Sequence, residues 1–277
     1  MNYPKVLTIQ DISCVGQCSL TVALPIISAC GIETCVLPSA ILSTHTAGFS
    51  GFTFRDLAGD MPSILNHWKK ENILFDGIYT GYLGSKEQVD YVLDIRANTL
   101  KSSGTFVVDP AFGDNGKLYP IFNQEYVDNM KRLVKECDIV IPNLTELCYL
   151  CDEKYPDSYD ESYIKKLVLK VIDMGAKAVV LTGISYEEGY TGIVTYKDGV
   201  FDYYKHEFLS NSCHGTGDIY ASAFVGALMK GNNVYESAKI AADYTLECIR
   251  KTAGDKSHWY GAKFELALPM LVEKVNR

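Results

Sequence analysis

Short apolar segments that end in polar or glycine-containing turns alternate with longer segments of helical periodicity along most of this chain. Each apolar segment predicts a buried strand, and the helix after it returns the chain to begin a neighbouring parallel strand. Strands are predicted at residues 5–10, 33–37, 105–110, 138–142 and 177–183, and within residues 75–84. We therefore expect an α/β fold with three α/β/α layers, in which helices flank a mostly parallel central sheet.

The segments between these strands predict helices up to residue 30 and at residues 54–71, 85–100, 124–136, 162–174, 234–249 and 263–275. Ser85 occupies an N-cap position, where its hydroxyl can accept an amide hydrogen bond from the first turn. Residues 189–196 and 199–207 predict a hairpin that turns at Lys197-Asp198-Gly199. Antiparallel strands should therefore form one edge of the sheet.

The chain has 277 residues, of which 47% are hydrophobic, so it can bury a large core. We expect one domain over residues 1–277, and the chain contains no internal repeat or Pro-Ser linker. The net charge is -8 and basic residues are scattered rather than gathered in a stripe. This distribution argues against nucleic acid and anionic membranes as partners and favours a small-molecule substrate.

The first residues contain no basic region followed by an apolar signal segment, and no run approaches the ~18 apolar residues of a membrane span. We therefore expect a cytoplasmic protein. Its nine cysteines show no disulfide-framework spacing, so reduced thiols are expected. Cys148 and Cys151 form a C-x-x-C, but no second pair completes a zinc site, and redox or metal chemistry is not favoured there.

Residues 211–231 contain a glycine-hinged turn that leads into a helix beginning near Gly217 or Asp218. Gly215 and Gly217 permit conformations closed to residues with a Cβ. Unpaired amides and the positive end of the helix dipole attract anions, so this turn predicts a phosphate cradle. Asp218 has two interpretations: it caps the helix, or it takes a proton from a hydroxyl that attacks phosphorus.

Oxygen-bearing side chains follow two neighbouring strands of the predicted sheet. Asp109 ends one strand, and Asn143 ends the next, with Glu146 at the start of the helix that follows. Together they suit a hard cation such as Mg²⁺, which usually retains waters. Taken singly, Asp109 also fits turn chemistry and Glu146 also fits favourable interaction with the helix dipole. The glycine-rich loop at residues 113–119 is expected to cover the phosphates.

Six segments resemble, in sequence and order, those of pyridoxal kinases in the ribokinase-like superfamily. These segments are Leu7-Thr-Ile-Gln10, Thr44-His-Thr46, Thr80-Gly-Tyr-Leu-Gly-Ser85, Val108-Asp-Pro110, Pro142-Asn-Leu-Thr-Glu146 and Gly215-Thr-Gly-Asp218. The resemblance covers nearly the full chain. It implies ATP-dependent phosphorylation of the 5′-hydroxymethyl group of a vitamin B6 vitamer, with Mg²⁺, by an enzyme that usually forms homodimers. It leaves open a requirement for a monovalent cation.

The resemblance also implies roles for individual residues. Asp218 would be the catalytic base. The anion hole would be formed by the backbone amides of three residues: Gly215, Thr216 and Gly217. Mg²⁺ and the ATP phosphates would be organised, largely through water, by Asp109, Asn143 and Glu146, with Asp114 and Thr182 nearby. The pyridine ring would be held by Thr46 and by the aromatic ring of Tyr82, with His45 close to the same pocket.

Two positions depart from the pyridoxal kinase pattern. Asp11 replaces a serine common in the family, and its carboxylate would favour a cationic or protonated vitamer. Cys213 and His214 precede the glycine turn, and His214 either touches nucleotide or has a structural role. Related hydroxymethylpyrimidine kinases end the turn motif in cysteine, whereas Asp218 stands here. The alternatives are a hydroxymethylpyrimidine kinase and a catalytically silent B6- or nucleotide-binding regulator.

Overall fold

The computed structural model describes residues 3–210 and 213–276, so Asn211 and Ser212, at the start of the predicted phosphate cradle, lie outside the described residues. The strands of the main sheet are β1 (Lys5–Ser13), β2 (Glu33–Leu42), β3 (Phe54–Asp56), β4 (Phe75–Thr80), β5 (Leu100–Val108), β8 (Ile139–Val140), β9 (Ala178–Ile184), β10 (Tyr190–Lys197) and β11 (Val200–Glu207). Two short strands, β6 (Gly113–Asp114) and β7 (Lys117–Leu118), form a separate hairpin.

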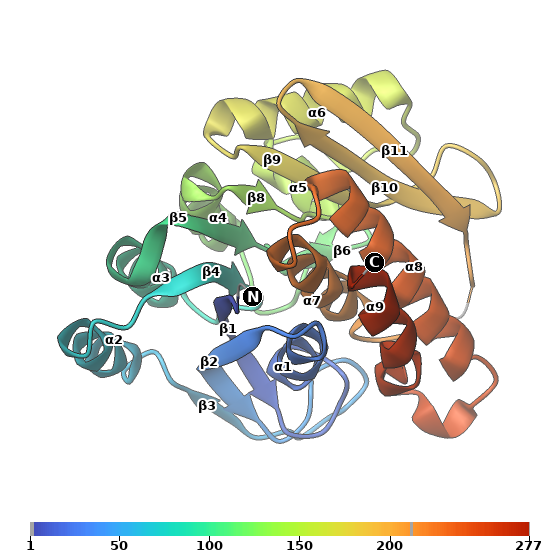
Figure 1. Ribbon diagram of the computed structural model, residues 1–277. Helices are drawn as coiled ribbons and strands as arrows, with labels where there is room; N and C mark the ends of the chain where they lie inside the picture. The colour runs from blue at the N-terminus through green and yellow to red at the C-terminus, as the bar shows by residue number, and fades with distance from the viewer. Residues whose placement is uncertain (1–2, 211–212, 277) are drawn as a thin grey trace.

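Within the described residues the main sheet has nine strands in the order β11-β10-β9-β8-β5-β4-β1-β2-β3 (Figure 1). The six strands from β9 to β2 pair in parallel. β3 runs antiparallel at one edge, and the β10–β11 hairpin runs antiparallel at the other. The predicted mostly parallel sheet and its antiparallel edge hairpin are therefore confirmed.

Helices cover both faces of this sheet (Figure 1). One face carries α1 (Leu20–Ala29), α7 (Thr216–Met229), α8 (Val234–Thr252) and α9 (Leu268–Val275). The other carries α2 (Met61–Lys70), α3 (Lys86–Thr99), α4 (Gln124–Glu136), α5 (Leu144–Leu150) and α6 (Glu161–Met174). Two short 3₁₀ segments, η1 (Lys256–His258) and η2 (Phe264–Ala267), lie between α8 and α9.

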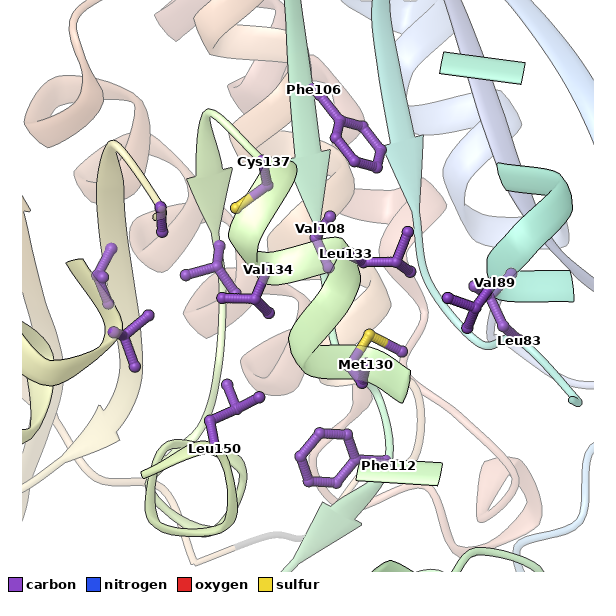
Figure 2. Packing of buried hydrophobic residues seen from close by; sticks show 14 of the residues in the cluster. Leu83, Val89, Phe106, Val108, Phe112, Met130, Leu133, Val134, Cys137 and Leu150 are labelled. Atoms are coloured by element: carbon purple, nitrogen blue, oxygen red, sulfur yellow. The ribbon is translucent and has the colours of Figure 1, made fainter. Parts of the chain in front are cut away.

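The apolar faces of the helices and the sheet form a separate buried cluster on each side. Figure 2 shows the packing of α4, where Met130, Leu133 and Val134 lie in one buried cluster with Val108 of β5. These four side chains are fully buried. Buried residues recur on every turn of α4 and form one apolar stripe along the helix. This regular spacing explains why the predicted bounds of the helix agree with the structure.

Two predicted helices are partly wrong. The helix predicted over residues 54–71 begins only at Met61, because Phe54–Asp56 instead forms an exposed edge strand paired with β2. The helix predicted over residues 263–275 is split, because η2 precedes α9 and Pro269 lies in the first turn of α9. Proline lacks an amide hydrogen and is best accommodated where a helix begins.

Local signals predicted other element boundaries correctly. Ser85 accepts a hydrogen bond from the Gln88 amide at the start of α3. Gly175, at a φ of 138°, ends α6. Among the described helices, none combines the length and the hydrophobicity that a membrane-spanning helix requires.

Candidate active site

Polar residues converge at the carboxyl ends of three neighbouring parallel strands. Asp109 follows β5, Asn143 follows β8, and Thr182 lies near the end of β9. The Asp109 amide donates to Thr80 O at 2.9 Å, and Asn143 forms an isolated parallel bridge with Thr182. The structure therefore brings together the side chains that sequence reasoning assigned to one sheet edge.

The start of α7 faces the same edge. Its N-cap is Gly215, at a φ of 76°, and a Cβ added there would lie 1.7 Å from Gln17 O. The helix begins at Thr216, slightly before the predicted start, and its first-turn amides have no intrahelical acceptor. Asp218 lies within this first turn and its side chain makes no cap hydrogen bond. The capping interpretation of Asp218 is therefore wrong.

A cavity of about 650 Å³ connects the α7 terminus with the sheet edge. Its lining includes all residues proposed from the resemblance for catalysis, metal and ATP: Asp109, Asp114, Asn143, Glu146, Thr182, Gly215, Thr216, Gly217 and Asp218. Cys213 and His214 also line it. The cavity thus joins amides that attract an anion with carboxylates that attract a cation.

The described lining contains four acidic residues and no lysine or arginine. The pKa of Asp218 is raised to about 7, chiefly by burial; a hydrogen bond from the Ser19 amide lowers this pKa, and the charge of Asp11 raises it. Burial, followed by Glu146 and Asp218, raises the pKa of Asp109. A polyphosphate in this cavity would need a cation to offset repulsion from these carboxylates, since the amides at the start of α7 supply only partial positive charge.

Asn143 and Glu146 both have structural hydrogen bonds. Asn143 Oδ1 accepts a hydrogen bond from the backbone amide of Glu146 at 3.0 Å. In return, Glu146 Oε2 accepts one from the backbone amide of Asn143 at 2.9 Å, so the two residues form a capping box on α5. Glu146 Oε1 accepts from the Phe112 amide, and Asn143 Nδ2 donates to Gly113 O. Both side chains therefore brace the loop that carries β6 and β7.

Asp109 is the better candidate to hold a metal, because it has spare acceptor capacity. Its Oδ1 accepts from the Ala111 amide at 3.2 Å, and its other oxygen accepts no hydrogen bond from the described residues. No group of three or more His, Cys, Asp or Glu side chains in the described ranges could form a metal site. The unoccupied oxygen of Asp109 suits Mg²⁺, which proteins usually hold through one or two carboxylates together with water and phosphate oxygens.

The four residues expected to bind the vitamer ring do not line the cavity. Asp11 is buried at the end of β1, and Tyr82 is half-buried beyond β4. His45 Nε2 donates to Tyr260 O at 2.7 Å, while its Nδ1 accepts from the Ala47 amide. Both ring nitrogens of His45 are therefore occupied by hydrogen bonds within the protein. Thr46 is exposed.

Sequence reasoning missed the apolar end of the cavity. It is formed by β10, β11 and α8 through Thr191, Ile193, His206, Ala242, Thr245, Leu246 and Ile249. The four lining residues on α8 are spaced like an ordinary core-facing stripe of a helix. Their spacing therefore gave no indication that this part of the helix faces a cavity.

The chain matches the phosphomethylpyrimidine kinase family over residues 64–261. It belongs to this family. A putative phosphomethylpyrimidine kinase from Bacteroides thetaiotaomicron, crystallised in an orthorhombic form with pyridoxal, is 36% identical with a TM-score of 0.92, covering 98% of this chain and 96% of that one. A pyridoxal kinase from Lactobacillus plantarum is 27% identical with a TM-score of 0.90, and 98% of each chain is covered.

This family member also resembles kinases of the pyrimidine branch. The hydroxymethylpyrimidine/phosphomethylpyrimidine kinase of Aquifex aeolicus is 27% identical over 187 residues, which are 66% of this chain and 70% of that protein. The predicted resemblance to pyridoxal kinases and the predicted fold are confirmed. The protein is a kinase of the phosphomethylpyrimidine and pyridoxal kinase family.

Proposed function

We propose that this chain is an ATP-dependent pyridoxal kinase that phosphorylates the 5′-hydroxymethyl group of a vitamin B6 vitamer within one domain over residues 1–277. The observation that carries the proposal is the position of Asp218. Its carboxyl group lies in the first turn of α7, beside amides with no intrahelical acceptor and in the same cavity as Asp109. A base, an anion site and a metal ligand are the groups that phosphoryl transfer requires.

In this mechanism the amides of Gly215, Thr216 and Gly217 bind the γ-phosphoryl group, where negative charge lies in the transition state. Asp218 accepts the proton of the attacking hydroxyl. Asp109, with Glu146 behind it, would hold Mg²⁺ directly or through water, and the ion would neutralise the phosphate oxygens. Polar contacts with ATP come from Asp114, Asn143 and Thr182. The base of the nucleotide fits the apolar end of the cavity.

The acceptor would bind on the other side of Asp218, between Tyr82 and Asp11, with His45 and Thr46 at its border. A pyridine ring stacks on an aromatic face and needs few polar contacts, so Tyr82 suits it. The second candidate acceptor is hydroxymethylpyrimidine, which the family match and the Aquifex aeolicus relative favour. Asp218 favours the pyridoxal branch, because related pyrimidine kinases end this turn in cysteine.

A coupled assay of ADP release tests the proposal with pyridoxal, pyridoxamine, pyridoxine, hydroxymethylpyrimidine and ribose as acceptors. We expect a B6 vitamer to have the highest kcat/KM, and the phosphorylated product should be confirmed by mass spectrometry. Higher kcat/KM with hydroxymethylpyrimidine would favour the second candidate. Binding of vitamer and ATP without turnover of any acceptor would favour a non-catalytic regulator.

We expect the kcat/KM for the vitamer to rise with pH and to reach half its plateau near pH 7. The pKa of Asp218 is about 7, and only its deprotonated form accepts the hydroxyl proton. Below this value, kcat/KM should fall about tenfold per pH unit. Initial rates at saturating ATP between pH 5.5 and 9 check this, with ATP affinity and the vitamer's own titration measured in the same buffers. A flat profile from pH 6 to 8 would contradict the base role.

The proposal also includes the homodimer and the cytoplasmic location expected from the sequence. Multi-angle light scattering of the purified chain tests the dimer. A monomeric mass across the working concentration range would remove the dimer from the proposal and would leave the chemistry of the site unchanged.

A further inference from the structure

The β6–β7 hairpin (residues 113–118) carries two residues of the cavity wall at its tip. Its strands are joined by a two-residue turn, Asn115-Gly116, with φ values of 51° and 75°. An Asn-Gly pair with two positive φ values is typical of a tight hairpin turn. Asp114 and Asn115 line the cavity. The position of the tip, residues 114–116, therefore sets where this wall of the cavity lies.

One side chain outside the hairpin holds the tip. The Gly116 amide donates a hydrogen bond to Thr145 Oγ1 at 2.9 Å. Thr145 lies in the first turn of α5 and is 2% exposed. The side chains of Asp114 and Asn115 bond only within this pair of residues. Across residues 3–210 and 213–276, the contact of Gly116 with Thr145 is thus the single hydrogen bond from the tip to a residue outside the hairpin.

The base of the hairpin is held by different groups. The Phe112 amide donates to Glu146 Oε1 at 2.9 Å, and Asn143 Nδ2 donates to Gly113 O at 2.8 Å. Both bonds lie before the tip. The methyl group of Thr145 packs at the base as well, because a Cβ added to Gly113 would lie 3.3 Å from Thr145 Cγ2. Thr145 therefore contacts the hairpin twice, with its methyl group at the base and its hydroxyl at the tip.

The ring of Tyr155 also packs against the tip. A Cβ added to Gly116 would lie 3.1 Å from Cδ1 and Cγ of this ring. Tyr155 is half-exposed, and an apolar contact is non-directional, so the ring can shift together with the glycine. A hydrogen bond depends on distance and angle. Thr145 therefore supplies the directional restraint on the tip.

We propose that Thr145 is a positioning residue for nucleotide binding, whose hydroxyl holds the tip of the β6–β7 hairpin where Asp114 and Asn115 complete the cavity wall. Without this hydrogen bond the tip would occupy several positions. ATP would then have to select the held position, which lowers its apparent affinity. The inference rests on the proposed function, because it takes this cavity to be the ATP site.

The test compares Thr145→Val with Thr145→Ser. Valine keeps the shape of the side chain and removes the acceptor, whereas serine keeps the acceptor and removes the methyl group. We expect Thr145→Val to raise KM for ATP by about three- to tenfold, the effect of one net hydrogen bond, and to leave kcat within about twofold. Thr145→Ser should stay within about twofold of wild type in both. Calorimetric binding of a non-hydrolysable ATP analogue with Mg²⁺, without acceptor, should show the same pattern.

Hydrogen exchange measured by mass spectrometry examines the contact without any ligand. In Thr145→Val the peptide that contains Gly116 should exchange faster, while the strands of the main sheet should keep their wild-type protection. Thr99→Val is the matched control. It removes a buried threonine hydroxyl, which donates to Ile95 O, just before β5 and at the end of that strand remote from Asp109. This control should leave ATP affinity and the exchange of the Gly116 peptide unchanged.

Unchanged ATP affinity together with unchanged exchange in Thr145→Val would overturn the proposal. Equal losses in Thr145→Val and Thr99→Val, or a fall in kcat at constant KM for ATP, would show a general structural role instead and would also overturn it. If the wild type binds the ATP analogue but phosphorylates no B6 vitamer, the proposed function fails alone. The affinities of the two Thr145 variants for the analogue then still decide the role of the hydroxyl.

Discussion

Asp218→Asn is expected to lower kcat by about 10²- to 10⁴-fold, the range that a positioned general base contributes. The asparagine amide has nearly the same size, so the turn before α7 and its free amides should persist. ATP and vitamer affinities should therefore stay within a few-fold of wild type. Single-turnover rates and equilibrium binding, measured on the same preparation, separate the lost chemistry from lost binding.

Stability provides the control for this variant. Burial raises the pKa of Asp218 in the folded protein to about 7, above its ordinary value of 3.8. The folded state is therefore favoured by this group at low pH, and that contribution is lost as pH rises from about 4 to 7. Asp218→Asn removes the buried charge, so at pH 8 its Tm should equal or exceed that of the wild type. Near-normal turnover in this variant would exclude the base role.

Gly215→Ala is expected to destabilise the fold by about 2–4 kcal/mol and to lower kcat at least about 100-fold. The added Cβ would overlap Gln17 O at 1.7 Å, and a φ of 76° is unfavourable for alanine. To relieve the overlap, the turn at residues 14–19 or the start of α7 must move. Either shift displaces the amides that would bind the transferred phosphoryl group, where small errors of position are costly.

The matched control for the stability effect lies two residues away. Gly217→Ala adds a Cβ that meets nothing within 4 Å, and Gly217 lacks a positive φ. Chemical denaturation should therefore show Gly215→Ala far below both wild type and Gly217→Ala. Equal unfolding free energies for the two variants would show that the contact between Gly215 and Gln17 is not important to the fold.

The candidate site was predictable where it depends on chain order. Parallel strands end at one edge of a sheet, so side chains directly after β5 and β8 must be neighbours, and Asp109 and Asn143 are. The glycine turn before α7 was predictable because Gly215 needs a conformation that other residues rarely adopt. The capping box that occupies Glu146 was not predicted, because a polar residue early in a helix fits several roles.

The alternation of strands and helices, the buried stripe of α4 and the antiparallel hairpin of β10 and β11 could all be predicted from the sequence, because periodicity and turn chemistry are local properties. Three features became visible only in the fold: Phe54–Asp56 pairs with β2, part of the apolar stripe of α8 faces a cavity, and Asp11 lies near Asp218 and Tyr82. These features depend on which surfaces meet across the fold, and contacts between distant segments leave no pattern in the residues of either segment alone.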